Sequence, residues 1–397
     1  MTHRATPGEP GGSTPPGSPE PLRASRLLLA GVDVVVTADG EVLVLEVNDH
    51  PGVLREPAGP DGRPPVLEAL ADALALRAGG DPCLVTLPEC FRLEPPGPST
   101  DAVTVAPASR LVGDFDRSET ALGDLSALLL GLRARGVDAA LADRPAADAH
   151  LAARGAARTV VFDRLPGVTG GPATEVVNTP GARDVCGDKL TTYRVLAAAG
   201  VPVVPCVPLG ELLRTGTDSG YAVLKPRVGA AGNGVERHAV TALRDLPDPG
   251  TDRIAQPWME LRRTTGGERS HRFDLRVLVV GGHARAALAR TAGAPADLLD
   301  GEPLLTWLTT TGRREALWID GAATDATGRY LTEELLTRAL RAAEAAVVAL
   351  DGELAARQAS GLTGATDHGF ARHNGVGGPL DLVTAVPLAN STATRGD

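Results

Sequence analysis

Lysine is almost absent from this chain. Of its 39 basic residues only two are lysines, Lys189 and Lys225, and the rest are arginines. Aromatic residues make up 3% of the sequence, and the acidic excess gives a net charge of −10, which argues against nucleic acid or an anionic membrane as the main partner. Lysine ends in a compact ammonium group, whereas arginine ends in a broad planar guanidinium. The two lysine positions are therefore candidates for a specific chemical role. The alternative is chance survival of two lysines under a high-GC codon bias.

Several common site motifs are missing as well. The eight histidines form no HExxH motif, no GxSxG motif occurs, and the cysteines show no CxxC spacing (Cys83, Cys90, Cys186 and Cys206). Such cysteines are predicted to be small core thiols in a reducing cytoplasm. The long apolar run at 195–210 contains three prolines, which excludes a membrane span there. We therefore expect a soluble, cytoplasmic protein.

Composition and periodicity separate the chain into stretches. Residues 1–21 are rich in Pro, Gly, Ser and Thr and predict a disordered tail, and residues 359–397 predict a loosely ordered one. Residues 79–180 alternate strand-like and helical runs, which indicates a small α/β domain with a parallel sheet. Helical spacing is also found at 66–77, at 189–199 and, most clearly, at 331–357.

A hairpin is predicted near the start of the chain. Residues 31–37 (GVDVVVT) and 41–48 (EVLVLEVN) flank Ala38-Asp39-Gly40, and Asp-Gly between apolar runs is a strong turn signal. If Asp39-Gly40 forms a two-residue turn, Val34 lies opposite Leu45 and Asp33 lies opposite Glu46.

The same register places Asn48 on the face that carries Asp33 and Glu46. Like charges directly opposed on an otherwise apolar hairpin are destabilising. Two carboxylates and an amide oxygen are suited to Mg²⁺ (or Mn²⁺) that is also bound by phosphate oxygens. The alternative is an ordinary edge hairpin with exposed acids, and a slip of one residue would move Asp33 to the other face.

Both lysines stand in contexts that suit a nucleotide. Lys225 ends the strand-like run 221–224 and is followed by Pro226 and by a glycine-rich loop at 229–234 (GAAGNG). Small residues let backbone N–H groups approach a phosphate, to which Lys225 adds a positive charge. Taken alone, such a loop is often only a flexible turn. Lys189 lies on the helix that ends at Gly200.

Two further segments complete the set of candidates. Residues 254–261 (IAQPWMEL) form a short connector whose backbone could meet an adenine ring. Arg276 and Arg290 lie on strand-like runs around Gly281-Gly282, where a guanidinium could meet phosphate or an anionic substrate. For either arginine alone, an ordinary surface position is the better interpretation, because arginine is abundant in this chain.

With these residues in view, the sequence resembles the ATP-grasp superfamily of ADP-forming carboxylate–amine ligases, of the glutathione synthetase and ribosomal-protein glutamate ligase type. GDKLTTYRVLAAAGVPV, VLKPRVGAAGNGV, IAQPWME, DLRVLVVGG and GVDVVV…VLEVNDHPG carry the resemblance. It implies catalytic roles for Arg276 and Arg290 and metal ligation by Asp33, Glu46 and Asn48. It also implies nucleotide contacts from Lys189, Lys225, Gly229, Ala230, Gly232, Asn233, Gly234, Gln256, Trp258, Met259 and Glu260.

The order of the segments differs from the family's usual one. There the metal-binding hairpin follows the helix that is 331–357 here, whereas in this chain it comes first. The resemblance thus implies a circularly permuted α/β fold, with α+β ATP-grasp subdomains at 22–78 and 181–358 and a pre-ATP-grasp-like domain at 79–180. Alternatively, the hairpin completes the site of a neighbouring subunit in a homodimer, or the chain is a remnant of a tandem array. A second departure is TWLTTTG at 306–312, where many relatives have an asparagine and paired glycines.

The function implied is ATP-dependent joining of a small-molecule carboxylate to an amine through an acyl phosphate, on amino acids or small peptides. ATP and Mg²⁺ are the expected cofactors. Two alternatives stay open, a non-catalytic ATP-binding module and a small-molecule kinase on the same fold.

Overall fold

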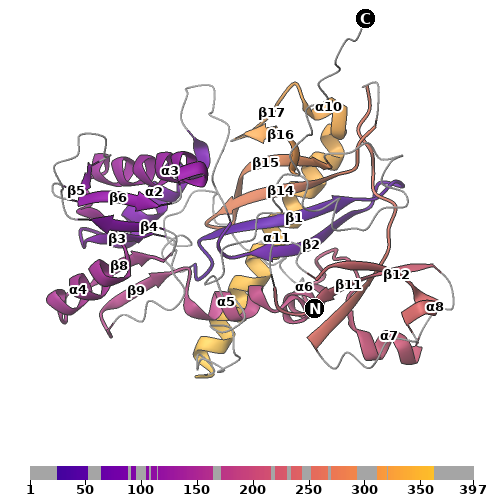
Figure 1. The fold of residues 1–397 in the computed structure, drawn as a ribbon, viewed down its shortest axis with the longest axis horizontal. Coiled ribbons are helices and arrows are strands. Elements are labelled where there is room, and N and C mark those ends of the chain that lie inside the picture. Colours follow the sequence, from indigo (N-terminus) through magenta and orange to yellow (C-terminus); the bar gives the residue numbers. More distant parts are fainter. Residues whose placement is uncertain are drawn as a thin grey trace, which may run out of the picture. The chain divides into compact units, whose positions relative to one another are not determined.

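The computed structural model describes residues 25–51, 64–87, 91–94, 104–106, 109–113, 115–163, 171–215, 220–229, 234–243, 252–266, 270–292, 311–319 and 321–361. Both predicted tails lie almost wholly outside these ranges. Helices and mixed sheets are combined, as expected for the α/β class (Figure 1). Among the described residues, no helix is both long and apolar enough to cross a membrane.

The largest sheet among the described residues has six antiparallel strands. Its order is β17-β16-β15-β14-β1-β2, so β1, the first strand of the chain, lies between β2 and β14. The predicted two-residue turn between β14 and β15 is present, because Gly281 and Gly282 both adopt positive φ (58° and 83°). The strands are β1 (Leu29–Val36), β2 (Val42–Asn48), β14 (Phe273–Val280), β15 (His283–Ala292), β16 (Thr311–Ile319) and β17 (Ala322–Ala323).

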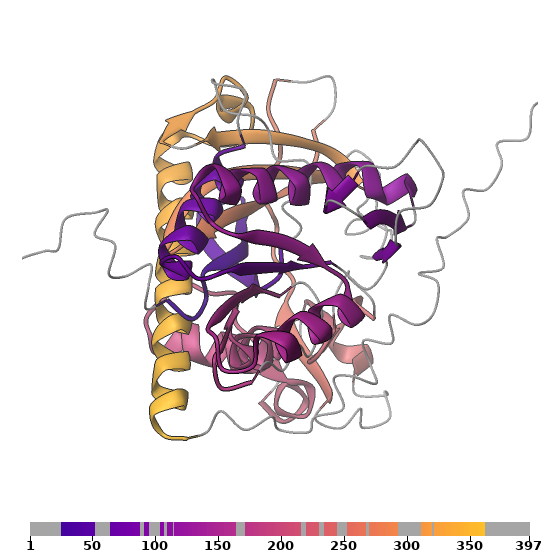
Figure 2. The ribbon, with the colours of Figure 1, turned by 90° about the vertical axis from the view of Figure 1, so that its left-hand side faces the viewer.

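The long helix α11 (Glu333–Ala359) covers one face of this sheet, along one side of the view in Figure 2. Thr332 caps its N-terminus by accepting from the Leu335 amide. The residues that face the strands are small, since Ala339, Ala343 and Ala346 are completely buried. Alternate residues of β1 and β14 join them in one apolar core, together with α5 (Pro180–Gly187), α6 (Lys189–Ala198) and α10 (Thr327–Tyr330).

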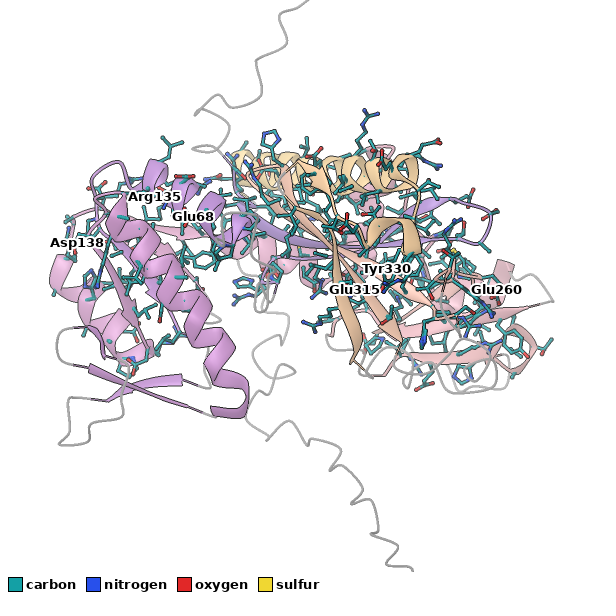
Figure 3. The ribbon with its side chains drawn as sticks, turned by 90° about the horizontal axis from the view of Figure 1, so that it is seen from above. Glu68, Arg135, Asp138, Glu260, Glu315 and Tyr330 are labelled. Atoms are coloured by element: carbon teal, nitrogen blue, oxygen red, sulfur yellow. The ribbon has the colours of Figure 1, made fainter. Side chains whose placement is uncertain are left out.

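Part of the opposite face packs against α2 (Pro65–Ala78) and α3 (Phe115–Ala134). Arg135, just after α3, bonds to Glu68 and Asp72 of α2, and Figure 3 shows it beside Glu68. The same core extends to the predicted parallel sheet, with the order β7-β3-β8-β9. Its strands are β7 (Ala139–Ala142), β3 (Cys83–Thr86), β8 (Thr159–Phe162) and β9 (Thr174–Val177). The helix α4 (Arg144–Arg154) belongs to a separate small core, in which Ala147 packs with Leu84, Ala142 and Val161.

Two smaller sheets complete the fold. One has the order β4-β6-β5, formed by Phe91–Glu94, Ser109–Gly113 and Thr104–Ala106. The other has the order β10-β13-β11-β12, formed by Val207–Pro208, Arg253–Pro257, Tyr221–Pro226 and Glu236–Ala239. The short helices α7 (Leu209–Thr215) and α8 (Val240–Leu243) cover one face of this second sheet. Its other face carries Lys225.

The predicted hairpin register is right at the acids and wrong nearer the turn. Asp33 pairs with Glu46 and Val32 with Val47, as expected, but Val34 pairs with Val44 instead of Leu45. The turn contains three residues, with Gly40 at φ +90°, because Thr37 donates its amide to the Glu41 carbonyl. A bulge between Asp33 and Val34 then absorbs the one-residue difference. The longer turn and the bulge thus shift the register in opposite directions, so Asp33 still pairs with Glu46.

The three cysteines that the structure describes lie in the core, as predicted. Cys83, Cys186 and Cys206 are buried free thiols. Burial raises the pKa of the Cys83 thiol to about 12, which makes it inert as a nucleophile. Cys90 lies outside the described residues.

Candidate active site

A row of charged side chains crosses the sheet face that lies opposite α11. Val32 and Val34 point to the α11 core, so Asp33 between them points the other way. Asp33 has Glu46 as its neighbour on β2 and Arg276 as its neighbour on β14. The three residues, predicted from separate parts of the sequence, therefore share one face.

Asp33 is held by both predicted arginines. Arg276 donates Nε and Nη2 to the two carboxylate oxygens at 2.8 Å each, and Arg290 Nη2 lies 3.0 Å from Oδ2. Burial opposes ionisation of the Asp33 carboxyl, but the two guanidinium groups outweigh it and lower its pKa. The carboxylate is thus ionised and fully paired in this structure.

Asp274 completes this cluster, and the sequence analysis did not identify it. Arg290 donates Nε and Nη2 to the Asp274 carboxylate at 2.7 and 2.6 Å, across the β14–β15 pair. Burial raises the pKa of Asp274, and the nearby charge of Asp33 acts in the same direction. Two buried acids and two arginines therefore neutralise each other beside the hairpin. The available signal was the aspartate of the DLR run, which lies across the predicted strand pair from the last arginine of the ALAR run.

The two lysines and Glu46 line one pocket, together with Gln256. The pocket lies between β2, α6, β11 and β13, and its walls also include Cys186, Thr192, Tyr193 and Val204. Glu46 comes from the start of the chain, Lys189 from α6 and Lys225 from the end of β11. Residues that the sequence marked separately are thus assembled in a single chain.

Burial and Glu46 act in opposite directions on the lysines. Desolvation lowers the pKa of Lys225, which is only 8% exposed, and that of Lys189, whereas the Glu46 carboxylate favours both ammonium groups. The Lys189 ammonium also donates to the Gly229 carbonyl at the start of the glycine-rich loop. A cavity with two partly desolvated cations is suited to a polyanion such as a phosphate chain.

Lys189 is oriented by Asp188, which the sequence analysis passed over. The Asp188 side chain caps α6 by accepting from the amides of Leu190 and Thr191. Arg227, two residues after Lys225, binds both oxygens of Asp188 at 2.8 and 2.5 Å. The start of α6 is therefore tied to the end of β11, which fixes the spacing of the two lysines.

The connector predicted to meet adenine is hydrogen-bonded to the hairpin. Ala38 donates its amide to the Glu260 carbonyl at 2.8 Å, and Arg262 donates to the Val36 carbonyl at 2.8 Å. Met259 packs with Leu45 and Val204 beside the pocket. Gln256 lines the pocket, but Trp258, Met259 and Glu260 are not part of its described wall, and the Glu260 side chain is largely exposed.

The oxygen donors of the hairpin fit a magnesium ion only when phosphate supplies further ligands. Asp33 and Glu46 are paired across the strands, and Asn48 Nδ2 lies 3.3 Å from Glu46 Oε1, which leaves the amide oxygen of Asn48 as the third hard donor. The described residues contain no cluster of three or more His, Cys, Asp or Glu suited to a metal. Asp33 would also have to exchange an arginine contact for the ion.

The remaining predicted residues are placed as follows. Gly229 contacts Lys189, as noted above. Gly234 has φ +68°, and a Cβ there would lie 2.9 Å from Pro226 Cγ, so a side chain is excluded by both strain and contact. Ala230, Gly232 and Asn233 lie outside the described residues, as does most of the 306–312 segment.

Two solved structures show distant similarity to the chain. No protein-family model matches the chain. A solved structure provisionally described as a γ-glutamylcysteine synthetase from Methylobacillus flagellatus KT is 11% identical, with a TM-score of 0.45, and covers 83% of this chain and 89% of its own. A D-cycloserine synthetase structure is 16% identical, with a TM-score of 0.36, and covers 69% of this chain and 82% of its own. Both proteins are named as synthetases, but similarity at this level assigns no residue or activity.

Proposed function

We propose that this protein is an ADP-forming carboxylate–amine ligase of the ATP-grasp type. The observation that carries the proposal is the assembly of Glu46, Lys189 and Lys225 in one pocket, with the charged cluster of Asp33, Arg276 and Arg290 next to Glu46. A phosphate chain on the lysines would thereby end beside two guanidinium groups. This is an arrangement for transferring a phosphoryl group to an anionic acceptor.

In the proposed reaction, a substrate carboxylate oxygen attacks the γ-phosphorus of ATP, and ADP leaves. An amine then attacks the acyl carbon, loses a proton and displaces phosphate, which leaves an amide. Lys189 and Lys225 hold the phosphates, Arg290 neutralises the transferring group and the later oxyanion, and Arg276 orients the substrate carboxylate. Asp33, Glu46 and Asn48 would hold magnesium, which would neutralise phosphate charge.

We also propose that the chain is a circular permutant of the usual ATP-grasp order. The segment before β1 is fixed to the last turns of α11. Asp351 Oδ1 accepts from the amides of Arg26 and Leu27 at 2.5 and 2.9 Å, and Arg26 Nε donates to Gln358 Oε1 at 2.8 Å. The hairpin therefore begins where the helix ends, as it would if a connection between them had been opened.

A nucleotide-binding module without turnover is the second candidate. It is favoured by the full pairing of Asp33 with arginines, because this pairing competes with metal binding. A kinase that phosphorylates a hydroxyl is the third, since the same phosphate and arginine groups would serve it.

One assay separates these functions. ADP release from Mg·ATP is measured across carboxylates paired with amines, drawn from amino acids and small peptides, and the products are identified by mass. Amine-dependent ADP release with an amide product supports the ligase. A phosphorylated product identifies the kinase, and ATP binding without ADP release identifies the module.

The site itself is tested with Lys225→Ala. This variant is expected to abolish detectable ATP binding, because it removes a buried cation from the phosphate pocket. Arg214→Ala, on α7 at the far side of the same small sheet, is the control and should bind ATP normally. Unchanged ATP affinity in Lys225→Ala would contradict the assignment of the pocket.

A further inference from the structure

Arg237, which no sequence motif marked, is stacked on two aromatic rings. Its guanidinium carbon lies 4.0 Å from the ring centroid of Tyr221 and 4.3 Å from that of Trp258. Tyr221 lies on β11, Arg237 on β12 and Trp258 just after β13. One cation thus joins three strands of the small sheet.

This stack lies on the sheet face that carries the phosphate-binding residues. Arg237 and Gln256 are both paired with Val223, one on each side, so the three side chains form a row on a single face. Lys225 lies two residues further along β11 and therefore points the same way. Gln256 and Lys225 both line the pocket, which places Arg237 on its side of the sheet.

The same face has a small apolar cluster, in which Val223 of the row packs with Val235 and Trp258. Val223 and Val235 are buried, and Trp258 is partly exposed. Tyr221 and Lys225 are separated by four residues of strand, or about 13 Å. A ligand with phosphates on the lysines would extend along this face toward the indole of Trp258.

Arg237 differs from its neighbours in having no acidic partner among the described residues. Arg253, on β13, pairs with Glu236, and Arg227, just after β11, pairs with Asp188. The Arg237 Nε is buried and makes no hydrogen bond to a described residue. An ion pair therefore does not account for the position of this guanidinium, whereas its contact with the indole does.

We propose that Arg237 is a positioning residue for the base of the bound nucleotide. It holds the partly exposed Trp258 indole in place, so that the indole forms a seat for a planar heteroaromatic ring while the phosphates bind Lys189 and Lys225. The inference deepens the proposed function and rests on it. Arg237 acts through Trp258 and touches no reacting atom.

The test compares two ligands that share phosphates and differ in the base. Binding of ADP and of inorganic tripolyphosphate, both without metal, is measured by calorimetry on the full chain. Arg237→Met is expected to weaken ADP binding by about fivefold, the size of a lost cation–π contact, and to leave tripolyphosphate binding unchanged. Arg237→Lys, which keeps a cation, should lose less. Arg214→Met, outside this face, is the matched control.

A double-mutant comparison tests whether Arg237 acts through the indole of Trp258. In Trp258→Phe, where the indole is missing, adding Arg237→Met should change ADP affinity by less than about twofold. Thermal melting of each variant separates the ligand effect from loss of fold.

Four results would overturn the proposal. Equal weakening of both ligands by Arg237→Met assigns the residue to general stability, and no weakening of either removes its role. If the unchanged protein binds tripolyphosphate as tightly as ADP, the base has no seat, although the phosphate site stands. If it binds neither, the proposed function fails together with this inference.

Discussion

The buried charges around Asp33 depend on one another. Asp33 and Asp274 share Arg290, and Arg276 is bound to Asp33 through both carboxylate oxygens. Removing a single member of such a cluster leaves a charge without its partner in a poorly solvated place. At the scale of single residues, the candidate site is therefore also part of what stabilises the sheet.

Asp274→Asn tests this coupling. We expect a loss of about 2 kcal/mol in the free energy of unfolding, because Arg290 keeps Asp33 but loses two charge-assisted hydrogen bonds. Urea denaturation provides the measurement. Glu353→Gln removes the half-exposed ion pair with Arg357 on α11 and should cost less than about 0.5 kcal/mol. A cost for Asp274→Asn no larger than for this control would show that the cluster does not contribute.

The lysines should make nucleotide binding depend on pH. Their pKa values are lowered, chiefly by burial, so each loses its proton at a lower pH than an exposed lysine does. A bound phosphate favours the ammonium form and raises the pKa again. Between the lowered and the raised value, binding must take up protons, and affinity falls as pH rises.

Calorimetry at about pH 9, in buffers of different ionisation enthalpy, measures this proton uptake, since the window lies below the ordinary pKa of lysine. Lys225→Arg keeps its charge throughout and should reduce the uptake. Affinity and heat that do not respond to buffer or pH would contradict the predicted desolvation of the lysines.

The residues identified from the sequence are those whose type is unusual at their position. The residues that were missed are those whose role depends on a partner elsewhere in the chain. Asp33 and Glu46 were identifiable because they interrupt apolar strands, and the lysines because lysine is scarce. Asp274, Asp188 and Arg237 look like ordinary polar residues until the strands are paired, when each acquires a partner from elsewhere in the chain.

At the scale of elements, α11 shows why side-chain size matters. Because the buried residues of this helix include small alanines, the helix packs close to β2 and to β1, the strand that carries Asp33.

Ala343→Leu is expected to destabilise the fold by about 1–3 kcal/mol through overpacking. Ala345→Leu, on the exposed side of the same helix, should stay within about 0.5 kcal/mol of the unchanged protein. Chemical denaturation of both variants measures the difference. Equal stability of the two would mean that the helix does not pack closely on the sheet.

Periodicity predicted the long elements well. The expected helix at 331–357 is observed at Glu333–Ala359, and the strand-like runs around Gly281-Gly282 are observed as β14 and β15. The hairpin turn was wrong by one residue, because a three-residue loop with Gly40 at positive φ and a two-residue Asp-Gly turn share the same sequence signal.

At the scale of the whole molecule, the order of segments was the main difficulty. No local pattern indicates that β1 pairs with β14, and this pairing was not predicted. In the structure this pairing places β1 inside a sheet whose other neighbours come mostly from residues 273–323.

A reordered chain tests the permutation. Residues 64–361, a Gly/Ser linker of about five residues and residues 25–51 are joined in that order, since contacts near Gln358 and Arg26 hold the two joined ends together. We expect the reordered protein to fold, with ADP affinity close to that of the original. As a control, a chain with the same linker but opened within α11 at Ala346 should not fold. A reordered chain that fails as completely as this control would contradict the proposed relationship.

The central position of β1 has a consequence for protein synthesis. Asp33 leaves the ribosome 243 residues before Arg276, its partner across the strands. At ordinary elongation rates this interval lasts on the order of tens of seconds, during which an apolar strand has no β14 to pair with. The nascent chain thus exposes an unpaired strand edge until β14 has been synthesised. In cells depleted of chaperones, this protein should aggregate more than proteins whose sheets form from consecutive strands.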